Sequence, residues 1–480
     1  MEPRILDPEP VLTLEDHLDL GGGRGLDVAR RLGPIGVIDH VEAAGLRGRG
    51  GAGFTTGLKW RTVAENLSAV VPPTVVVNAA EGEPGTFKDR AILRRNPYKV
   101  LEGALVAATA IGADRVILAL KASFTTELER VRGAIAEAKA SGWADGVELV
   151  VVEGPSHYLY GEETALLEVV SGRQPFPRIA PPFRHGAEEV GGDTVSAAEV
   201  TMAGPDNPSA APPTLVNNVE TLANVGGILA EGPDWYRGVG TAESPGSIVC
   251  TVTGRTRRHG VAEFPMGTPL RQVIEAIGGG TDPGERVVAV MSGVANPLLP
   301  ASALDAPVSY EGMQEAGAGL GSAGFIVFDE TTDLTAVAHG VSRFLSVESC
   351  GQCTPCKQDG LAITGLLDQL RRSAFDGHDL AVVEDKLATV ADSARCYLAS
   401  QHQLVIESIF RLFPEEVRGH LTGGAPEAPI EVIAPILDLR DDRATLDRGH
   451  LDKQPDWTDD PVDSGQAPAD RMDQRAPDPT

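Results

Sequence analysis

The pattern of apolar and polar positions divides the chain into stretches of different character. Residues 1–35 are mostly polar and contain Gly21-Gly22-Gly23, which would interrupt a helix, so we predict an N-terminal arm. Residues 36–46 have apolar side chains at helical spacing and lead into a glycine-rich loop at residues 48–53. We expect this helix to open the first folded domain, residues 36–244.

Short apolar runs alternate with amphipathic stretches through this domain. We predict strands at residues 74–78, 115–120 and 147–153, and helices at residues 100–112 and 125–140. Strands that alternate with helices favour an α/β fold with a largely parallel sheet. Because ligands bind beyond the carboxyl ends of the strands in such sheets, we expect binding residues within 78–83 and 154–163.

The pattern changes twice after residue 244. Residues 245–329 combine apolar strands at their two ends with one helix and many glycines, which predicts a small α+β domain. Residues 330–435 have helical spacing at 334–348, 361–373, 379–391 and 404–412, which predicts a helical bundle. Residues 436–480 are acidic and have few apolar side chains, so we expect a disordered tail.

Four of the five cysteines lie in the helical region. Cys350, Cys353 and Cys356 form a C-x2-C-x2-C run, and Cys396 is the next cysteine along the chain. A ferredoxin run would be followed at once by its fourth cysteine, so here the fourth ligand must come from another element. We predict one [4Fe–4S] cluster bound by these four side chains. The alternative is a structural zinc site, although such sites usually arrange their cysteines as two C-x2-C pairs.

Three other polar motifs each allow a binding role and a structural role. Residues 48–53 satisfy G-x-G-x-x-G, but a helix precedes them where a dinucleotide-binding loop needs a strand. They therefore form either a loop that approaches phosphate or a plain surface loop. Glu162 and Glu163 would cap a helix or contact a ligand, and Asn217 and Asn218 leave the same two interpretations open.

Composition excludes several classes of protein. Hydrophobic residues make up 42% and charged residues 23% of the 480 residues, as in a globular protein. The formal charge of -27 argues against nucleic-acid binding and favours partners with basic surfaces. The sequence opens without a signal-peptide pattern and contains no uninterrupted run of about twenty apolar residues, so we expect a cytoplasmic protein.

Five motifs, taken in order, resemble one protein family. They are GLRGRGGAGFTTGLKW (45–60), NAAEGEPGTFKDR (78–90), YLYGEETALLE (158–168), PTLVNNVETLANV (213–225) and ESCGQCTPCKQDG (348–360). Over residues 12–430 the chain resembles the NADH-binding flavoprotein subunit of respiratory complex I and the diaphorase subunits of NAD-linked hydrogenases and formate dehydrogenases. The resemblance implies a Rossmann-like FMN-binding domain, a ubiquitin-like β-grasp domain at 245–329 and a helical domain that carries a [4Fe–4S] cluster.

The resemblance also implies site residues by position. FMN contacts are implied at Gly48, Gly50, Lys59, Asn78, Gly161, Asn217, Asn218 and Thr221, with Lys59 at the phosphate. NADH contacts are implied at Phe54, Glu83, Glu163 and Phe183, where the aromatic pair stacks on adenine and the glutamates position the ribose and nicotinamide end. No protein acid or base is implied, because the chemistry belongs to the cofactors.

Some residues depart from the family pattern on the side that binds the pyridine nucleotide. Ala80 stands where the family usually has Asp beside the flavin. Ala180 replaces a Lys that helps to hold NADH, and Thr62 stands at a position that is often aromatic. The FMN and cluster motifs are intact, and these departures point to an altered pyridine-nucleotide site.

The resemblance implies an oxidoreductase subunit of the NADH dehydrogenase (quinone) type. It would transfer a hydride from NADH to FMN and then single electrons through the cluster to a small [2Fe–2S] subunit and a larger iron–sulfur or catalytic subunit. Any attachment to the inner face of the membrane would be through these partners. One alternative keeps both cofactors but uses another electron donor or acceptor. Another, from a different class, is a non-catalytic scaffold that binds zinc.

Overall fold

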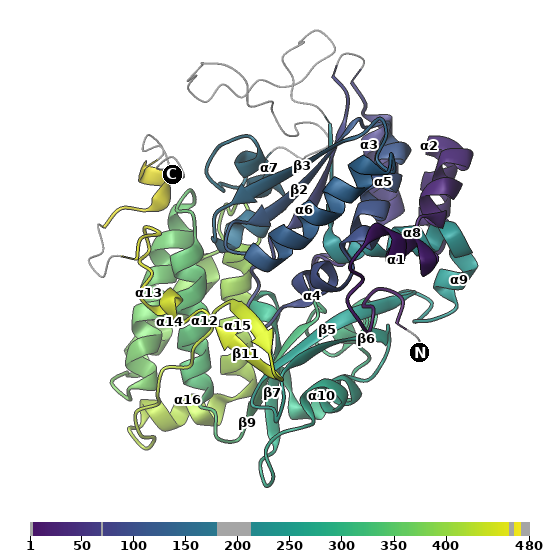
Figure 1. Cartoon of the computed structure of the whole chain (residues 1–480). Helices are drawn as coiled ribbons and strands as arrows, with labels where there is room; N and C mark the ends of the chain where they lie inside the picture. Colours follow the sequence, from purple (N-terminus) through teal and green to yellow (C-terminus); the bar gives the residue numbers. More distant parts are fainter. Residues whose placement is uncertain (1–2, 69–70, 180–212, 460–464, 472–480) are drawn as a thin grey trace. The chain divides into compact units, whose positions relative to one another are not determined.

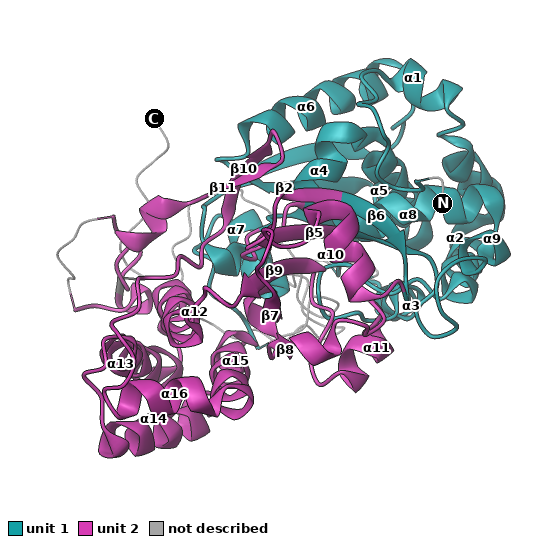
Figure 2. Cartoon of the chain, turned by 90° about the horizontal axis from the view of Figure 1, so that it is seen from below, with its two compact units in different colours: residues 1–81, 88–249, 262–267 teal, residues 82–87, 250–261, 268–480 magenta. Residues whose placement is uncertain are grey.

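The computed structural model describes residues 3–68, 71–179, 213–459 and 465–471. It divides into two compact units, coloured separately in Figure 2. The first unit contains residues 1–81, 88–249 and 262–267, and the second contains residues 82–87, 250–261 and 268–480. Each unit therefore combines stretches that are distant in the sequence.

A four-stranded sheet forms the centre of the first unit (Figure 1). Its order is β3-β2-β1-β4, built from β1 (Thr74–Ala79), β2 (Arg115–Lys121), β3 (Glu148–Gly154) and β4 (Thr214–Asn218). Val76 in β1 pairs with Ile117 on one side and Val216 on the other, and every pairing is parallel. Parallel neighbours require crossover connections, so the topology confirms the predicted α/β fold.

Helices connect the strands of this sheet. They are α1 (Leu14–Asp19), α2 (Arg24–Ala44), α3 (Thr56–Glu65), α4 (Lys88–Arg95), α5 (Pro97–Ile111), α6 (Thr125–Ala140), α7 (Glu163–Val170), α8 (Val219–Glu231) and α9 (Pro233–Arg237), with the 3₁₀ turn η1 (Tyr158–Gly161) before α7. α5 packs against α2 and α8 and is buried along most of its length.

The N-terminal arm was predicted wrongly for residues 24–35, which form the first half of α2. Gly33 has a non-helical conformation with a φ of 69°, and together with Pro34 it forms a kink between the two helical halves of α2. Leu26 and Ala29 are buried in this half. The kink interrupts the apolar periodicity, which is why the pattern did not reveal the helix.

A five-stranded mixed sheet follows in the sequence. Its order is β6-β5-β9-β7-β8, built from β5 (Ser247–Gly254), β6 (Gly260–Pro265), β7 (Val287–Ser292), β8 (Leu299–Pro300) and β9 (Gly324–Asp329). β9 is parallel to β5 and antiparallel to β7. The helices α10 (Leu270–Gly278) and α11 (Tyr310–Glu315) and the 3₁₀ turns η2 (Gly293–Ala295) and η3 (Ala301–Ala303) complete an α+β arrangement.

The second unit continues with five helices among the described residues, one more than the four that the periodicity predicted. They are α12 (Leu334–Glu348), α13 (Thr354–Arg371), α14 (Gly377–Thr389), α15 (Leu398–Leu412) and α16 (Pro414–Leu421). α12 packs against α13 and α15, and α13 packs against α14. α13 begins earlier than predicted because Pro355 lies in its first turn, a favourable position for proline.

The tail from residue 436 was predicted to be disordered, and for much of its length this was wrong. β10 (Ile436–Arg440) and β11 (Arg443–Leu446) form an antiparallel hairpin, and the 3₁₀ turns η4 (Arg448–Leu451) and η5 (Pro468–Arg471) follow. Ile436 and His450 are buried, and Trp457 donates its indole N–H to the carbonyl of Val347 at 3.0 Å. A few apolar and aromatic side chains anchor a segment whose average composition is acidic.

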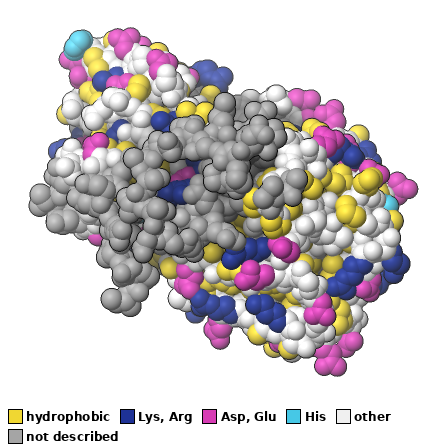
Figure 3. All heavy atoms as spheres, turned by 90° about the horizontal axis from the view of Figure 1, so that it is seen from above, with side chains coloured by type: hydrophobic (Ala, Val, Ile, Leu, Met, Phe, Trp, Pro, Cys, Tyr) yellow, Lys and Arg dark blue, Asp and Glu magenta, His cyan; other side chains and the backbone are white. Residues whose placement is uncertain are grey.

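No helix among the described residues is long and apolar enough to cross a membrane. On the face shown in Figure 3, basic and acidic side chains are interspersed. Despite the formal charge of -27, the described residues on this face do not form an unbroken acidic surface.

Candidate functional site

The carboxyl ends of β1 and β4 bring several predicted FMN residues together. Asn78 in β1 is in register with Asn218 in β4, and Asn217 is next to it on β4. Asn78 Nδ2 donates to the carbonyl of Gly161 at 2.8 Å, which ties the end of η1 to β1. These residues lie at the edge of the sheet where parallel sheets bind their ligands.

The glycine-rich loop is anchored against the start of α8. The backbone N–H of Arg49 donates to Thr221 Oγ1 at 2.8 Å, and a Cβ at Gly50 would lie 3.3 Å from the Cβ of Asn218. The Arg49 side chain is buried, with 1% of the residue exposed, and donates to Tyr236 Oη and to the carbonyl of Ser247, each at 3.0 Å. Arg49 thus holds the loop from inside the fold and does not offer its charge to a phosphate.

Lys59 and Glu163 form an ion pair at this site. Lys59 comes from α3 and Glu163 from the first turn of α7, and Nζ lies 2.5 Å from Oε1 with both side chains partly exposed. The neighbouring Trp60 donates its indole N–H to Asn217 Oδ1 at 2.7 Å, which fastens α3 to β4. The predicted phosphate ligand and one of the predicted NADH contacts therefore touch each other.

In each of the pairs Glu162–Glu163 and Asn217–Asn218, one residue caps a helix and the other contacts a side chain of α3. Glu162 is the N-cap of α7 and accepts the N–H groups of Thr164 and Ala165, and burial raises its pKa. Asn218 is the N-cap of α8 and accepts the N–H of Glu220 at 3.0 Å. Glu163 faces Lys59, and Asn217 faces Trp60.

A buried cluster of charges next to Asn218 was missed from the sequence. Asn218 Nδ2 donates to Asp89 Oδ2 at 2.6 Å, and Asn218 Oδ1 accepts from Lys88 Nζ at 3.2 Å. Lys88 Nζ also lies 2.6 Å from Asp89 Oδ1 and 3.0 Å from Glu220 Oε2. Burial opposes the charge of Lys88, but the two carboxylates outweigh it and raise the lysine pKa. Burial, together with the nearby Asp89, raises the pKa of Glu81 to about 7.

The residues expected to contact NADH are only partly described. Phe54, which follows the glycine-rich loop, is 55% exposed. Glu83 belongs to the second unit, where its Oε1 accepts the N–H of Val294 at 2.6 Å. Phe183 and the substituted Ala180 lie outside the described residues.

The four cysteines predicted as ligands all lie in the second unit. Cys350 and Cys356 are each 7% exposed, whereas Cys353 and Cys396 are half-buried. Cys353 is the N-cap of α13, and Cys396 lies in the connection between α14 and α15. The N–H of Arg395 donates to Cys353 Sγ at 3.4 Å, so the backbone beside Cys396 meets the cysteine run.

Hydrogen-bond donors surround these sulfur atoms. Ser349 Oγ lies 3.3 Å from Cys356 Sγ, and Gln352 Nε2 donates to Cys350 Sγ at 3.4 Å. Burial raises the pKa of the Cys356 thiol to about 11 and lowers that of the adjacent Lys357 to about 8. Among the described residues, no three Cys, His, Asp or Glu side chains converge on a position for a single metal ion. Donors directed at sulfur suit an anionic group bound through thiolates, so the site fits an iron–sulfur cluster.

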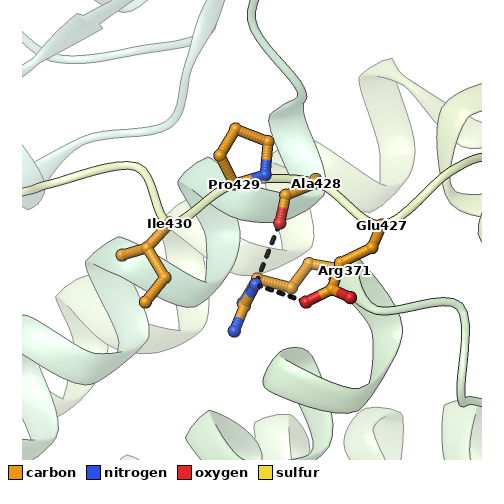
Figure 4. Close-up of a pocket in the computed structure, with 5 residues that line it drawn as sticks. All are labelled: Arg371, Glu427, Ala428, Pro429 and Ile430. Atoms are coloured by element: carbon orange, nitrogen blue, oxygen red, sulfur yellow. Dashed lines mark hydrogen bonds and ion pairs between the residues drawn. The ribbon is translucent and has the colours of Figure 1, made fainter.

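Figure 4 shows an open pocket elsewhere in the second unit, lined by Arg371, Glu427, Ala428, Pro429 and Ile430. Arg371 donates to the carbonyl of Ala428 at 2.9 Å, and its guanidinium lies 3.8 Å from Glu427. None of the predicted site residues lines it. We interpret Arg371 as a residue that holds the segment after α16 in place.

Three family models match consecutive parts of the chain. The Nuo51 FMN-binding domain matches residues 41–227, the SLBB domain residues 249–294, and the NADH-ubiquinone oxidoreductase-F iron-sulfur binding region residues 336–420. These matches confirm the predicted FMN and [4Fe–4S] cofactors, and they favour the cluster over zinc at the cysteines.

Individual relatives agree with these models. An F subunit of the NADH-quinone oxidoreductase of Rhizobium meliloti (strain 1021) is 35% identical over 397 residues, covering 81% of this chain and 89% of the relative. The corresponding F subunit of Streptomyces coelicolor (strain ATCC BAA-471 / A3(2) / M145) is 35% identical over 442 residues, covering 89% and 92%. The crystal structure of NAD+-reducing [NiFe]-hydrogenase in the H2-reduced state matches with a TM-score of 0.72 and 31% identity, over 86% of this chain and 67% of that chain. The family inferred from the motifs is confirmed, and the chain belongs to the family of NADH-quinone oxidoreductase F subunits.

Proposed function

We propose that this chain is the electron-input subunit of a multi-subunit oxidoreductase, taking a hydride from NADH and delivering single electrons to partner subunits. The observation that carries the proposal is the presence, in one chain, of an FMN-binding domain and of a four-cysteine iron–sulfur region. When bound, FMN accepts two electrons as a hydride and the cluster carries one electron at a time. The side chains of the protein bind and orient the cofactors and set the charge around them.

Lys59, the glycine-rich loop and the N-terminus of α8 would bind the FMN phosphate, because together they supply a cation and backbone N–H donors. Asn78, Asn217 and Asn218 would hold the remainder of the cofactor from the sheet edge. A phosphate at Lys59 competes with the carboxylate of Glu163 for the same ammonium group. FMN binding would therefore release Glu163 from its ion pair and make it available to NADH.

Cys350, Cys353, Cys356 and Cys396 would bind the cluster in the second unit. The parallel pairing of β5 with β9 and the helix α10 that directly follows β6 support a β-grasp fold for residues 245–329. A subunit with one flavin and one cluster does not complete an electron path to a terminal acceptor. We expect a small [2Fe–2S] subunit and a larger iron–sulfur or catalytic subunit as partners, with any membrane attachment through them.

Anaerobic titration of the purified, cofactor-loaded protein tests this function. Separate additions of NADH, NADPH and reduced ferredoxin are followed by flavin absorbance. We expect NADH to bleach the flavin. Bleaching by another donor alone would favour the alternative to which Ala80 and Thr62 point, and no bleaching by any donor in fully loaded protein would reject the function.

A further inference from the structure

The C-terminal segment contacts the cysteine loop, although the two are far apart in the sequence. The N–H of Ala469 donates to the carbonyl of Cys350 at 3.0 Å. Beside it, a Cβ at Gly351 would lie 2.4 Å from the Cβ of Ala467 and 3.6 Å from Cδ of Pro468. Pro468 itself is buried. Residues 467–469 therefore cover the Cys350–Gly351 peptide directly.

Residues upstream fasten the same segment along the end of α12, the helix that leads into the cysteine loop. Glu348, the last residue of α12, is 1% exposed and accepts a hydrogen bond from Lys453 Nζ at 2.7 Å. His450 Nε2 lies 2.9 Å from the same carboxylate oxygen, and the His450 ring stacks on Phe344 with centroids 4.9 Å apart. The segment is thus held by charged and aromatic contacts before it reaches the cysteines.

A buried lysine provides a direct link between this segment and the cysteine run. Lys357, which follows Cys356, is 2% exposed. Its Nζ donates to the carbonyl of Ser349 at 2.9 Å and to the carbonyl of Pro455 at 2.7 Å. One ammonium group therefore joins the residue before Cys350 to the tail.

None of these tail residues falls within the family models, the last of which ends at residue 420. The contacts are therefore supplied by a part of this chain beyond the recognised iron–sulfur region. We propose that residues 448–459 and 465–471 complete the cluster site on its Cys350 side and shield the bound cluster from water and from soluble reagents. This inference rests on the proposed assignment of the four cysteines as cluster ligands.

The C-terminal segment covers the cysteine site on its Cys350 side. Cys350, under the segment, is 7% exposed, whereas Cys353 and Cys396 are half-buried. Solvent exposure is one of the factors that set the stability and potential of iron–sulfur clusters. Removing the segment should open the Cys350 side and leave the surroundings of Cys353 and Cys396 as they are.

Two truncations of the cofactor-loaded chain provide a matched test. A chain that ends at residue 471 keeps every contact described above, and a chain that ends at residue 459 loses Ala467, Pro468 and Ala469 but retains the contacts of Lys453 and Pro455. Iron release to bathophenanthroline disulfonate is followed under anaerobic, reducing conditions. We expect release from the shorter chain to be faster by roughly tenfold, because a local cover has been removed, and release from the longer chain to match the full-length protein.

A point variant keeps the test valid if the shorter chain does not fold. Ala467→Glu places a carboxylate against Gly351 and beside an anionic cluster, so it should accelerate iron release and raise deuterium exchange in the peptide 349–357. Gln466→Glu adds the same charge at an exposed neighbour and should change neither. Equal release from both truncations at full iron content would overturn the shielding role. A full-length chain that binds no iron at all would instead reject the cluster assignment on which it rests.

Discussion

At the scale of single residues, Asn218 shows how buried charged side chains can fix the orientation of an amide. Its Nδ2 donates to Asp89, and its Oδ1 accepts from Lys88 and from the N–H of Glu220. An amide with both ends occupied by groups of fixed character cannot rotate to exchange them. We infer that the Lys88–Asp89 pair orients Asn218 for the FMN contact proposed above.

Asp89→Asn tests this role. The variant replaces a carboxylate acceptor by a neutral amide and weakens the hold on Asn218 Nδ2. A hydrogen bond to a charged group contributes about 1.5–3 kcal/mol, so we expect FMN affinity to fall by roughly tenfold or more. Flavin fluorescence titration of the apoprotein measures the change. Asp305→Asn, which alters an exposed partner of Arg271, should leave FMN affinity unchanged, and an unchanged affinity in Asp89→Asn would exclude the orienting role.

Cys396→Ala tests the fourth cluster ligand. Because Cys396 approaches the run from a separate connection, its loss should abolish the cluster and electron transfer to a partner, while FMN stays bound and is still reduced by NADH. Iron content and flavin bleaching report the two halves of this expectation. Cys250→Ala is the matched control, since Cys250 is fully buried in β5 and should not affect iron. Full iron content in Cys396→Ala would show that another residue completes the site.

Residue-level prediction worked where a motif carried the signal. The cysteine run and the Asn217-Asn218 pair were found, and the structure brings Asn78, Gly161 and Asn218 to one sheet edge. The burial of Lys88 and Asp89 was missed because consecutive charged residues normally lie on a solvated face. No neighbouring residue in the sequence indicates that these two are buried. The ion pair of Lys88 with Glu220 and its hydrogen bond to Asn218 are formed by the tertiary fold, so they cannot be predicted from periodicity.

At the scale of elements, apolar runs located the strands well because buried parallel strands need side chains of one kind. β1 and β2 lie where the pattern placed them. The predictions were wrong where a few side chains or a single kink determine the local structure. The kink at Gly33 hid the start of α2, and the acidic composition after residue 436 hid the hairpin and the segment held by His450 and Trp457.

The helical region should be sensitive to acid through His402 on α15. Burial lowers the pKa of His402 from its ordinary value of 6.5 to about 4, and its Nε2 lies 2.8 Å from Ser342 Oγ on α12. The unfolded chain therefore binds the proton first, so the contribution of neutral His402 is fully present above about pH 6.5 and is lost as the pH falls toward 4. A shift of this size corresponds to roughly 3 kcal/mol.

His402→Gln provides the comparison, because glutamine keeps a hydrogen bond to Ser342 but does not titrate. Denaturant unfolding at pH 7.5 and pH 5 should show a smaller loss of stability for the variant than for the unaltered chain. His339, whose pKa burial also lowers to about 4, remains in both proteins and supplies a shared background. Parallel losses in the two proteins would exclude His402 as the sensor.

At the scale of the whole molecule, the division into units does not follow the order of the sequence. Residues 82–87 belong to the second unit although both of their sequence neighbours belong to the first. In the second unit, the N–H of Leu298 donates to the buried Ser408 Oγ at 3.0 Å, and Arg255 pairs with Glu431 at 2.9 Å. The predicted boundary at residues 329 and 330 therefore runs between parts that share a buried hydrogen bond and a solvent-exposed ion pair.

Two fragments test whether that boundary separates independent folding units. We expect a fragment of residues 245–471 to be more stable than one of residues 330–471, because the shorter fragment leaves Ser408 without Leu298 and Glu431 without Arg255. A buried hydrogen bond whose partner is removed costs about 1–3 kcal/mol, which corresponds to a fall in melting temperature of at least roughly 2 °C. Calorimetry of the two fragments measures the difference. Ser408→Ala in the longer fragment should reproduce part of it, since the N–H of Leu298 then stays buried without its acceptor, whereas Arg286→Gln, which removes an exposed pair with Glu330, should not. Equal melting temperatures for the two fragments would establish residues 330–471 as a domain that folds by itself.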